Sequence, residues 1–207
     1  MGVYIDSDLG AATHVRRTVS RCFAALRQLR LLRRYVTNDC FRYLVVSLVH
    51  SRLHYGNLVF VGLPVYLQRR FQAVLNAAAR LVFQLRRYDH VTDALAVLHW
   101  LCLPERVNFK LALMAYRVLN GMTPSYLNQL VLASDLPGRR RLRSSLTLEL
   151  VVPPYRLSTV GRRSFPVAAS ISWNSLPDDV QSATSLSTFW RQLKTFLFQK
   201  SFPDIIL

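Results

Sequence analysis

Apolar residues recur every three or four positions through residues 13–35, and this period constrains the fold more than any other feature of the chain. The recurring residues are Val15, Val19, Cys22, Phe23, Leu26 and Leu29. Residues at this spacing lie on one face of an α-helix. Most arginines of the segment fall outside that face. The segment therefore predicts an amphipathic helix with one apolar face and many exposed basic side chains.

Further helices are predicted along the chain from start and stop signals. Residues 37–57 begin with Thr37 or Asn38 as the N-cap and form a second, mostly buried helix. Pro64 suits the first turn of a third helix over residues 62–85. Additional helical segments are predicted at residues 92–100, 103–121 (with Pro104 near its start and Gly121 past its end), 123–132, 163–180 and 185–202.

The composition changes at Asp135. Residues 135–145 are a basic loop, and residues 146–154 alternate or run apolar as a strand would. We therefore expect a mainly α fold, a helical bundle followed by a basic linker and a small α+β C-terminal region. The expected parts are a strand and turn at 1–10, a helical domain at 11–132, a linker at 133–145 and a small mixed region at 146–207.

The charge of the chain favours a polyanionic partner. The sequence has 27 Lys and Arg against 11 Asp and Glu, a formal net charge of +16, and nearly all the positive residues are Arg. The flat guanidinium fork matches phosphate oxygens and stacks on bases. RNA or DNA is therefore the first expected partner, and an anionic membrane surface is the second.

Four arginine clusters are the candidate nucleic-acid-binding residues. Several of them have Tyr35, Tyr88 or His90 beside them, as a phosphate-contacting groove with stacking partners would. The alternative is a solvated basic surface without a ligand. The candidate residues are Arg27, Arg30, Arg33, Arg34, Arg69, Arg70, Arg86, Arg87, Arg139, Arg140, Arg141 and Arg143.

Two groups of residues could hold a metal ion. Asp6 and Asp8 follow a short apolar run, but no third carboxylate stands at a useful spacing, so we favour turn and helix-capping roles. Asp89, His90, Asp93 and His99 are the densest cluster of possible ligands. Because its histidines are nine residues apart, we favour Thr92 or Asp89 as a helix cap and His99 packed beside Trp100.

The cysteines and the hydropathy of the chain indicate its cellular compartment. Cys22, Cys40 and Cys102 form no C-x-x-C pair, so we expect reduced core cysteines. No signal peptide is apparent. Polar and helix-breaking residues interrupt the most apolar stretch, residues 43–67, whereas a membrane span needs about 20 predominantly apolar residues. We expect an intracellular protein of the nucleus or cytoplasm without a membrane span.

Nine segments, taken in order, resemble one protein family. They are GVYIDSDL, RCFAALRQLRLLRRYVT, SLVHSRLHYGNLVFVGLP, FQAVLNAAARLVF, RRYDHVTDALAVLHWLCLPERVNFK, AYRVLNGMTPSYL, RRRLRSS, STVGRRSFPVAASISWNSLPDDV and FWRQLKTFLFQKSF. These segments resemble the C-terminal part of the reverse transcriptase of LINE-type, non-LTR retrotransposons. The resemblance covers essentially the whole chain.

The resemblance implies a fragment of an RNA-directed DNA polymerase. Residues 1–10 would be the end of the palm, residues 11–132 the thumb, and the remainder a post-polymerase region. The family's palm holds Mg²⁺ through a Tyr-x-Asp-Asp turn and an earlier Asp, and this chain has no such turn. We therefore expect no cofactor and no polymerase activity for this chain alone, and non-specific binding of RNA or DNA.

Two other functions stay open. The chain could be an active polymerase when another polypeptide supplies the palm and fingers. It could also be a helical module, derived from the element, that binds a protein or a membrane surface.

Overall fold

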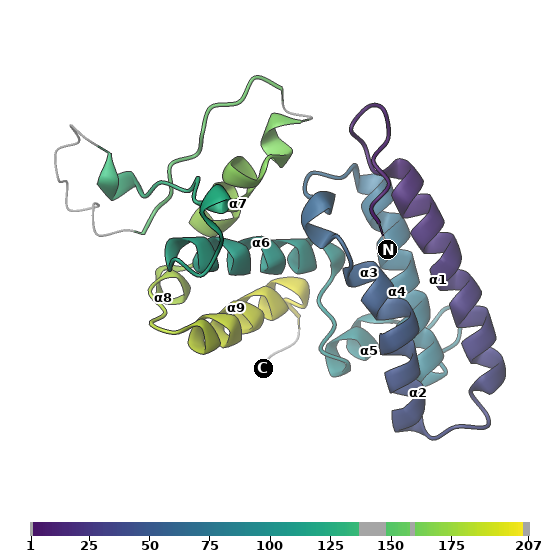
Figure 1. Cartoon of the computed structure of the whole chain (residues 1–207). Coiled ribbons are helices and arrows are strands. Elements are labelled where there is room, and N and C mark those ends of the chain that lie inside the picture. The colour runs from purple at the N-terminus through teal and green to yellow at the C-terminus, as the bar shows by residue number, and fades with distance from the viewer. Residues whose placement is uncertain (1, 137–147, 158–159, 205–207) are drawn as a thin grey trace. The chain divides into compact units, whose positions relative to one another are not determined.

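The computed structural model describes residues 2–136, 148–157 and 160–204. These residues are mainly helical, as the sequence predicts (Figure 1). They form two compact units. The first comprises the described residues up to Pro104 and those from Ser201 on, and the second runs from Glu105 to Lys200. The boundaries expected at residues 132 and 145 do not coincide with this division.

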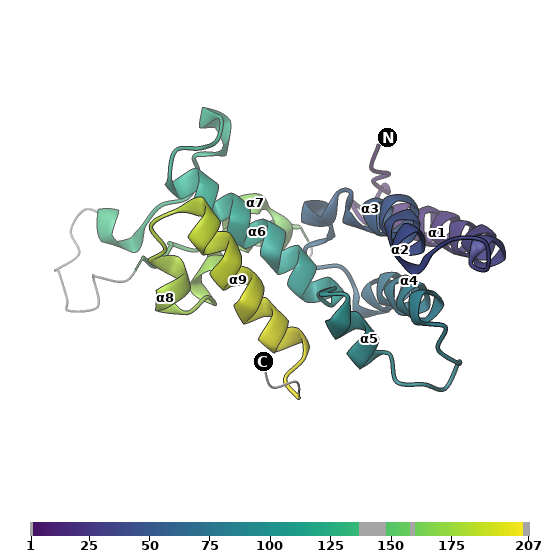
Figure 2. The same cartoon turned by 90° about the horizontal axis from the view of Figure 1, so that it is seen from below.

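The first unit is built around two long helices. Figure 1 and Figure 2 show α1 and α4 side by side, and α2 packs against both. The helices are α1 (Ala12–Leu32), α2 (Asn38–Val45), α3 (Ser51–His54), α4 (Val65–Phe83) and α5 (Thr92–Val97), with a π-helical turn at Val46–His50 and a 3₁₀ turn at Asn57–Phe60.

The apolar stripe of α1 forms part of the core, as predicted. Val15, Cys22, Leu26 and Leu29 are buried, and Val19 and Phe23 lie half-buried at the margin. Buried residues of α4 include Phe71, whose ring lies 5.0 Å from that of Phe60. Burial of these side chains removes their apolar surface from water, which stabilises the unit.

The second predicted helix forms, but it is interrupted, and the prediction that it is mostly buried is wrong, since Phe41 and Val45 are the only buried residues of α2. Thr37 is its N-cap, and its side chain accepts a hydrogen bond from the Cys40 N–H at 3.4 Å. The π-helical turn then separates α2 from α3. Gly56 follows in the left-handed region at φ +73°, which glycine adopts without strain, so the predicted stop is confirmed.

The cysteines differ from one another in burial. Only Cys22 is buried, whereas Cys40 is exposed and Cys102 is half-buried. Cys40 belongs to the first turn of α2, where Phe41 and Val45 fill the core positions instead. The prediction that all three are core cysteines is therefore wrong for Cys40.

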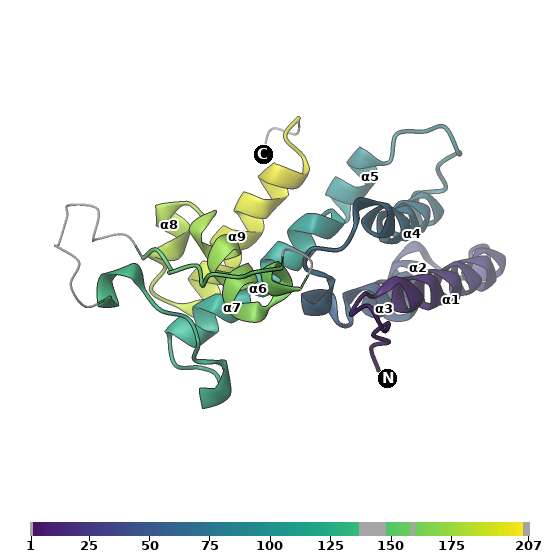
Figure 3. The same cartoon turned by 90° about the horizontal axis from the view of Figure 1, so that it is seen from above.

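The second unit is organised around an aromatic core. Figure 3 shows the backbone of its helices from above. The Tyr116 ring stacks on that of Phe189 at 4.3 Å, and the Trp173 ring lies 5.8 Å from the same Phe189. Its helices are α6 (Leu103–Leu119), α7 (Phe165–Asn174), α8 (Asp178–Gln181) and α9 (Leu186–Ser201), with short 3₁₀ turns at Ser125–Leu127, Ala133–Asp135 and Gly161–Arg163.

The predicted boundaries of α6 are confirmed, since Pro104 is its second residue and Gly121 lies just past its end at φ +65°. The helix predicted at residues 123–132 is reduced to the Ser125–Leu127 turn. The one predicted at residues 163–180 is divided into α7 and α8, with Pro177 preceding α8.

The strand predicted at residues 146–154 is wrong for its described part. The described residues contain only one isolated antiparallel bridge, between Leu132 and Leu150. The side chain of Asn174 satisfies the backbone of Leu150: it accepts a hydrogen bond from the N–H and donates one to the C=O, both at 2.8 Å. Pro153 and Pro154 then follow, and proline cannot donate a backbone hydrogen bond to a neighbouring strand.

Candidate nucleic-acid interface

A basic hollow of about 780 Å³ lies between α1 and the C-terminal end of α4. We name it the arginine groove. Apolar residues of both helices, including Leu26 and Leu81, form part of its lining. Its arginines are Arg27, Arg30, Arg33, Arg80, Arg86 and Arg87.

Helix geometry explains why Arg27 and Arg30 of α1, and Arg33 directly after it, reach one groove. Arg27, Arg30 and Arg33 are spaced by three residues, which places them along one flank of a helix. Arg33 also donates a hydrogen bond to the carbonyl oxygen of Val82 at 3.4 Å. This contact brings the end of α1 to the end of α4, where the remaining groove arginines lie.

Arg33 holds the helices together. Its guanidinium donates to Asn38 Oδ1 at 2.6 Å and lies 4.8 Å from the centre of the Phe41 ring. With the bond to Val82, these contacts join α1, α2 and α4 at one point. Arg33 therefore positions the groove in addition to contributing charge.

Hydrogen bonds hold the loop after α4 so that Arg86 and Arg87 lie at the groove. Gln84 ends the helix in the left-handed region at φ +55°. Arg80 donates to the carbonyl oxygen of Asp89 at 3.3 Å, and the Asp89 carboxylate accepts the backbone N–H of Arg86 at 2.6 Å. These bonds keep Arg86 and Arg87 at the groove, with both side chains exposed.

The electrostatic potential of the groove is positive. Residues 1–104 contain fourteen arginines and five aspartates, with no lysine or glutamate. The buried Nε atoms of Arg33 and Arg80 have no hydrogen-bond partner in the described structure. Both α1 and α4 end here, and the partial negative charge of their last carbonyls is offset by the guanidiniums. The groove can hold anions, and its arginines offer bidentate donors.

The predicted site residues separate into three groups. Arg27, Arg30, Arg33, Arg86 and Arg87 meet in the groove. Arg34, Arg69 and Arg70 are exposed but do not line it; the Arg34 guanidinium lies 5.7 Å from the Tyr35 ring. The last four, Arg139, Arg140, Arg141 and Arg143, lie outside the described residues.

Arg80 is a groove residue that the sequence-based set omits. It stands alone among apolar residues of α4, without the neighbouring arginines that define the other clusters. Only the packing of α1 on α4 places it beside Arg30 and Arg33, so no sequence signal could have assigned it.

The two N-terminal carboxylates bind backbone N–H groups. Asp6 Oδ2 accepts from Thr13 at 3.1 Å, in the first turn of α1, and Asp8 Oδ1 accepts from Gly10 at 2.9 Å. The turn and capping roles are therefore confirmed. Hydrogen bonds from Thr13 lower the pKa of Asp6 below its ordinary value of 3.8.

The capping roles predicted near α5 are wrong. The helix begins at Thr92 without a side-chain cap, because the Asp89 carboxylate is bound to Arg86. Trp100 packs against His50, with ring centres 4.9 Å apart, while His99 is exposed in the left-handed region at φ +53°.

No family model matches the chain, and neither a curated protein nor a solved structure matches it. Among the helices that the structure describes, none combines the length and the apolar composition needed to cross a bilayer.

Proposed function

We propose that this chain binds the phosphate backbone of RNA or DNA through the arginine groove, without reading base sequence. The observation that carries the proposal is the convergence of arginines from α1 and from the loop after α4 on one hollow. Guanidiniums bind phosphate oxygens whatever the adjoining base, so such contacts give affinity and register but no sequence specificity.

Exposed aromatic rings support a nucleic-acid ligand. Tyr35 follows the end of α1, and Tyr88 follows Arg87 in the loop after α4; their side chains are 75% and 88% exposed. Large exposed rings beside phosphate-binding side chains are the usual platforms for stacking unpaired bases. We therefore expect single-stranded regions to bind at least as tightly as duplexes.

The proposed context is the C-terminal part of a LINE-type, non-LTR retrotransposon reverse transcriptase. The nine ordered segments support this relation, and residues 11–132 would hold template and primer behind a palm. The groove would then bind nucleic acid, and polymerisation would require palm carboxylates that residues 1–207 do not contain.

A pair of double substitutions tests the groove. Arg86→Gln with Arg87→Gln removes two exposed groove charges, and Arg69→Gln with Arg70→Gln removes two adjacent exposed charges outside its lining. We expect the groove pair to weaken binding of a labelled single-stranded RNA by about tenfold, and the control pair by much less. Fluorescence anisotropy measures both. Equal losses would show that diffuse charge, and not the groove, binds the strand.

A second candidate function is binding of a protein or a membrane surface. Large apolar side chains are exposed near the end of α1 and on α2: Leu31 by 61%, Leu32 by 47% and Tyr43 by 74%. Such side chains are typical of interaction surfaces. Co-sedimentation with anionic vesicles, with RNA as competitor, separates the two functions: vesicle binding that RNA does not displace at physiological salt would favour this alternative.

The third possibility, an enzyme completed by another chain, is tested by primer extension. With Mg²⁺, dNTPs and a primed RNA template, we expect no incorporation by this chain alone. Robust extension would overturn the proposal that its carboxylates have no catalytic role.

A further inference from the structure

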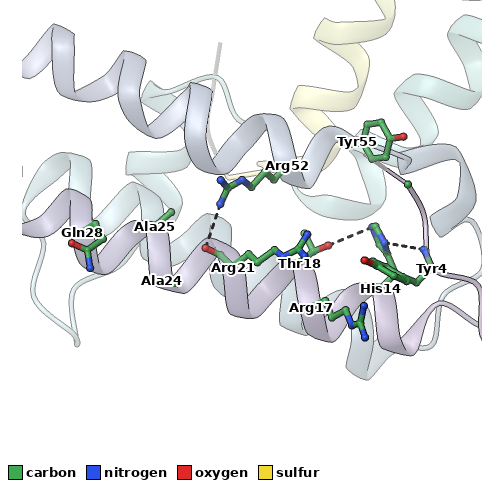
Figure 4. Close-up of a pocket in the computed structure, with 11 residues that line it drawn as sticks. Tyr4, His14, Arg17, Thr18, Arg21, Ala24, Ala25, Gln28, Arg52 and Tyr55 are labelled. Carbon is green, nitrogen blue, oxygen red and sulfur yellow. Dashed lines mark hydrogen bonds between the residues drawn. The ribbon is translucent and has the colours of Figure 1, made fainter.

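A second basic hollow, of about 580 Å³, lies on the opposite flank of α1 from the arginine groove, beside α3 and the N-terminal segment (Figure 4). We call it the N-terminal hollow. We propose that it binds a dianionic phosphate monoester through Arg17, Arg21 and Arg52. The two hollows share no lining residue. This inference is therefore independent of the proposed function of the groove.

Two elements supply the three arginines that line the hollow. Arg17 and Arg21 are four residues apart on α1, so they lie on one face of the helix. Arg52 comes from α3 and donates a hydrogen bond to the carbonyl oxygen of Arg21 at 3.5 Å, as Figure 4 shows. The Arg17 guanidinium lies 4.4 Å from the centre of the Tyr4 ring.

The buried His14 determines that the Thr18 hydroxyl in the lining can act as a hydrogen-bond donor. His14 is only 5% exposed, and its Nδ1 accepts the backbone N–H of Tyr4 at 3.3 Å. Burial, and then the charge of Arg21, lower its pKa, which favours the neutral ring. Its proton is therefore on Nε2, which donates to Thr18 Oγ1 at 3.4 Å. The Thr18 hydroxyl, having accepted that bond, has its own proton to donate.

The charge of the lining selects an anion. The described residues that line the hollow include three arginines and no aspartate or glutamate. The Tyr4 hydroxyl reports the same positive potential: hydrogen bonding and charge from Arg17, followed by the charge of Arg21, lower its pKa below 10.0.

The number of guanidiniums indicates the ligand class. A phosphate monoester carries a charge of about −1.5 to −2 at pH 7 and three terminal oxygens, one for each guanidinium. A backbone diester carries one negative charge and has only two such oxygens. The monoester could belong to a free mononucleotide or to the phosphorylated end of a strand, because both present the same group.

Isothermal titration with inorganic phosphate and with a nucleoside monophosphate at pH 7.5 tests the site. We expect saturable binding of both, and weaker binding of dimethyl phosphate. Arg21→Gln and Arg52→Gln should each weaken binding by about tenfold or more. Arg42→Gln is the matched control, because it removes the same charge from an exposed residue of α2 that lines neither hollow; it should change affinity by less than about twofold.

A conservative variant guards against misfolding. Arg21→Lys keeps the charge but loses the bidentate fork, so we expect a loss of several-fold with an unchanged circular dichroism spectrum. Absence of saturable phosphate binding, or an equal loss in Arg42→Gln, would overturn the proposal.

Oligonucleotides with and without a 5′-phosphate distinguish a free mononucleotide from the phosphorylated end of a strand as the ligand. An affinity gain from the 5′-phosphate that Arg21→Gln abolishes would identify strand ends. Saturation by mononucleotide without that gain would identify the free nucleotide. Failure of the groove proposal would instead appear as unchanged binding of the unphosphorylated strand by the Arg86 and Arg87 variant.

Discussion

Two polar side chains of this chain accept hydrogen bonds from backbone N–H groups at helix N-termini. Asp6 accepts the Thr13 N–H at the start of α1, and Thr37 accepts the Cys40 N–H at the start of α2. The first N–H groups of a helix have no partner within the helix, so a side-chain acceptor stabilises its start. The Asp6 contact stabilises the start of α1, the helix that contributes to both basic hollows.

Asp6→Ala should lower the melting temperature at neutral pH. The lowered pKa of Asp6 means that its ionised form stabilises the fold above pH 3.8, and this contribution is lost as pH falls through the folded-state pKa. Thermal melts of wild type and variant should therefore converge as pH falls below about 3.8. Asp6→Asn keeps an acceptor oxygen for Thr13, so it should retain part of the stability; an identical loss would contradict the capping role.

The cysteines should differ strongly in reactivity. Burial raises the pKa of the Cys22 thiol to about 11, and the side chain is fully buried. The thiolate is the reactive form, so Cys22 should resist a disulfide reagent at pH 8 until the chain unfolds, while exposed Cys40 reacts quickly. Mass spectrometry of the labelled peptides gives the order. Early labelling of Cys22 would place it outside a stable core.

At the scale of elements, segments 131–133 and 149–151 lie next to each other without forming a sheet. Their backbone bonds join Ala133 to Glu149 and Val151 to Val131, both at 2.8 Å. Leu150 lies between Glu149 and Val151 in the chain, and its backbone N–H and C=O bond to the side chain of Asn174 in α7. A helix side chain thus replaces the further strand that a sheet would need.

Asn174→Ala should destabilise the second unit. It leaves the N–H and C=O of the buried Leu150 without their partner, and an unsatisfied buried group costs about 1–3 kcal/mol. Urea unfolding monitored by tryptophan fluorescence measures the change, because Trp173 is adjacent in the chain. Asn120→Ala is the control, since the amide of exposed Asn120 donates to the carbonyl oxygen of Tyr116 at the end of α6. A similar small loss in both variants would contradict this role of Asn174.

At the scale of the whole molecule, basic residues are spread along the sequence, and the fold gathers some of them. Fourteen arginines in residues 1–104 make up about half of the 27 basic residues of the chain. The packing of α1 on α4 converts part of this charge into a groove. A field of this kind raises the local concentration of polyanions and speeds their association.

Nucleic-acid affinity should fall steeply with salt. If Arg27, Arg30, Arg86 and Arg87 each neutralise one phosphate, the slope of log K against log salt should be about −3 for a single strand. Raising the salt from 50 to 200 mM should then weaken binding by about fiftyfold. Anisotropy titrations over this range measure the slope. Binding that is indifferent to salt would contradict phosphate recognition.

Much of the local structure follows from neighbouring residues and is readable from the sequence. The apolar stripe of α1 predicts its buried face, and Thr37, Pro104 and Gly121 mark helix ends where the structure has them. These signals depend on backbone geometry within a few residues. The exposed position of Cys40 could not be predicted in this way, because it depends on which face of α2 meets α1 and α4.

Sequence by itself determined a mainly helical, strongly basic chain and the clusters of arginine within it. Tertiary structure alone decided which of those arginines meet: it added Arg80 to the groove, left Arg69 and Arg70 outside, and placed Arg21 beside Arg52 in a second hollow. The physical reason is that helix formation depends on contacts within about one turn. A binding site depends on side chains from helices far apart in the chain, and only their packing brings those side chains together.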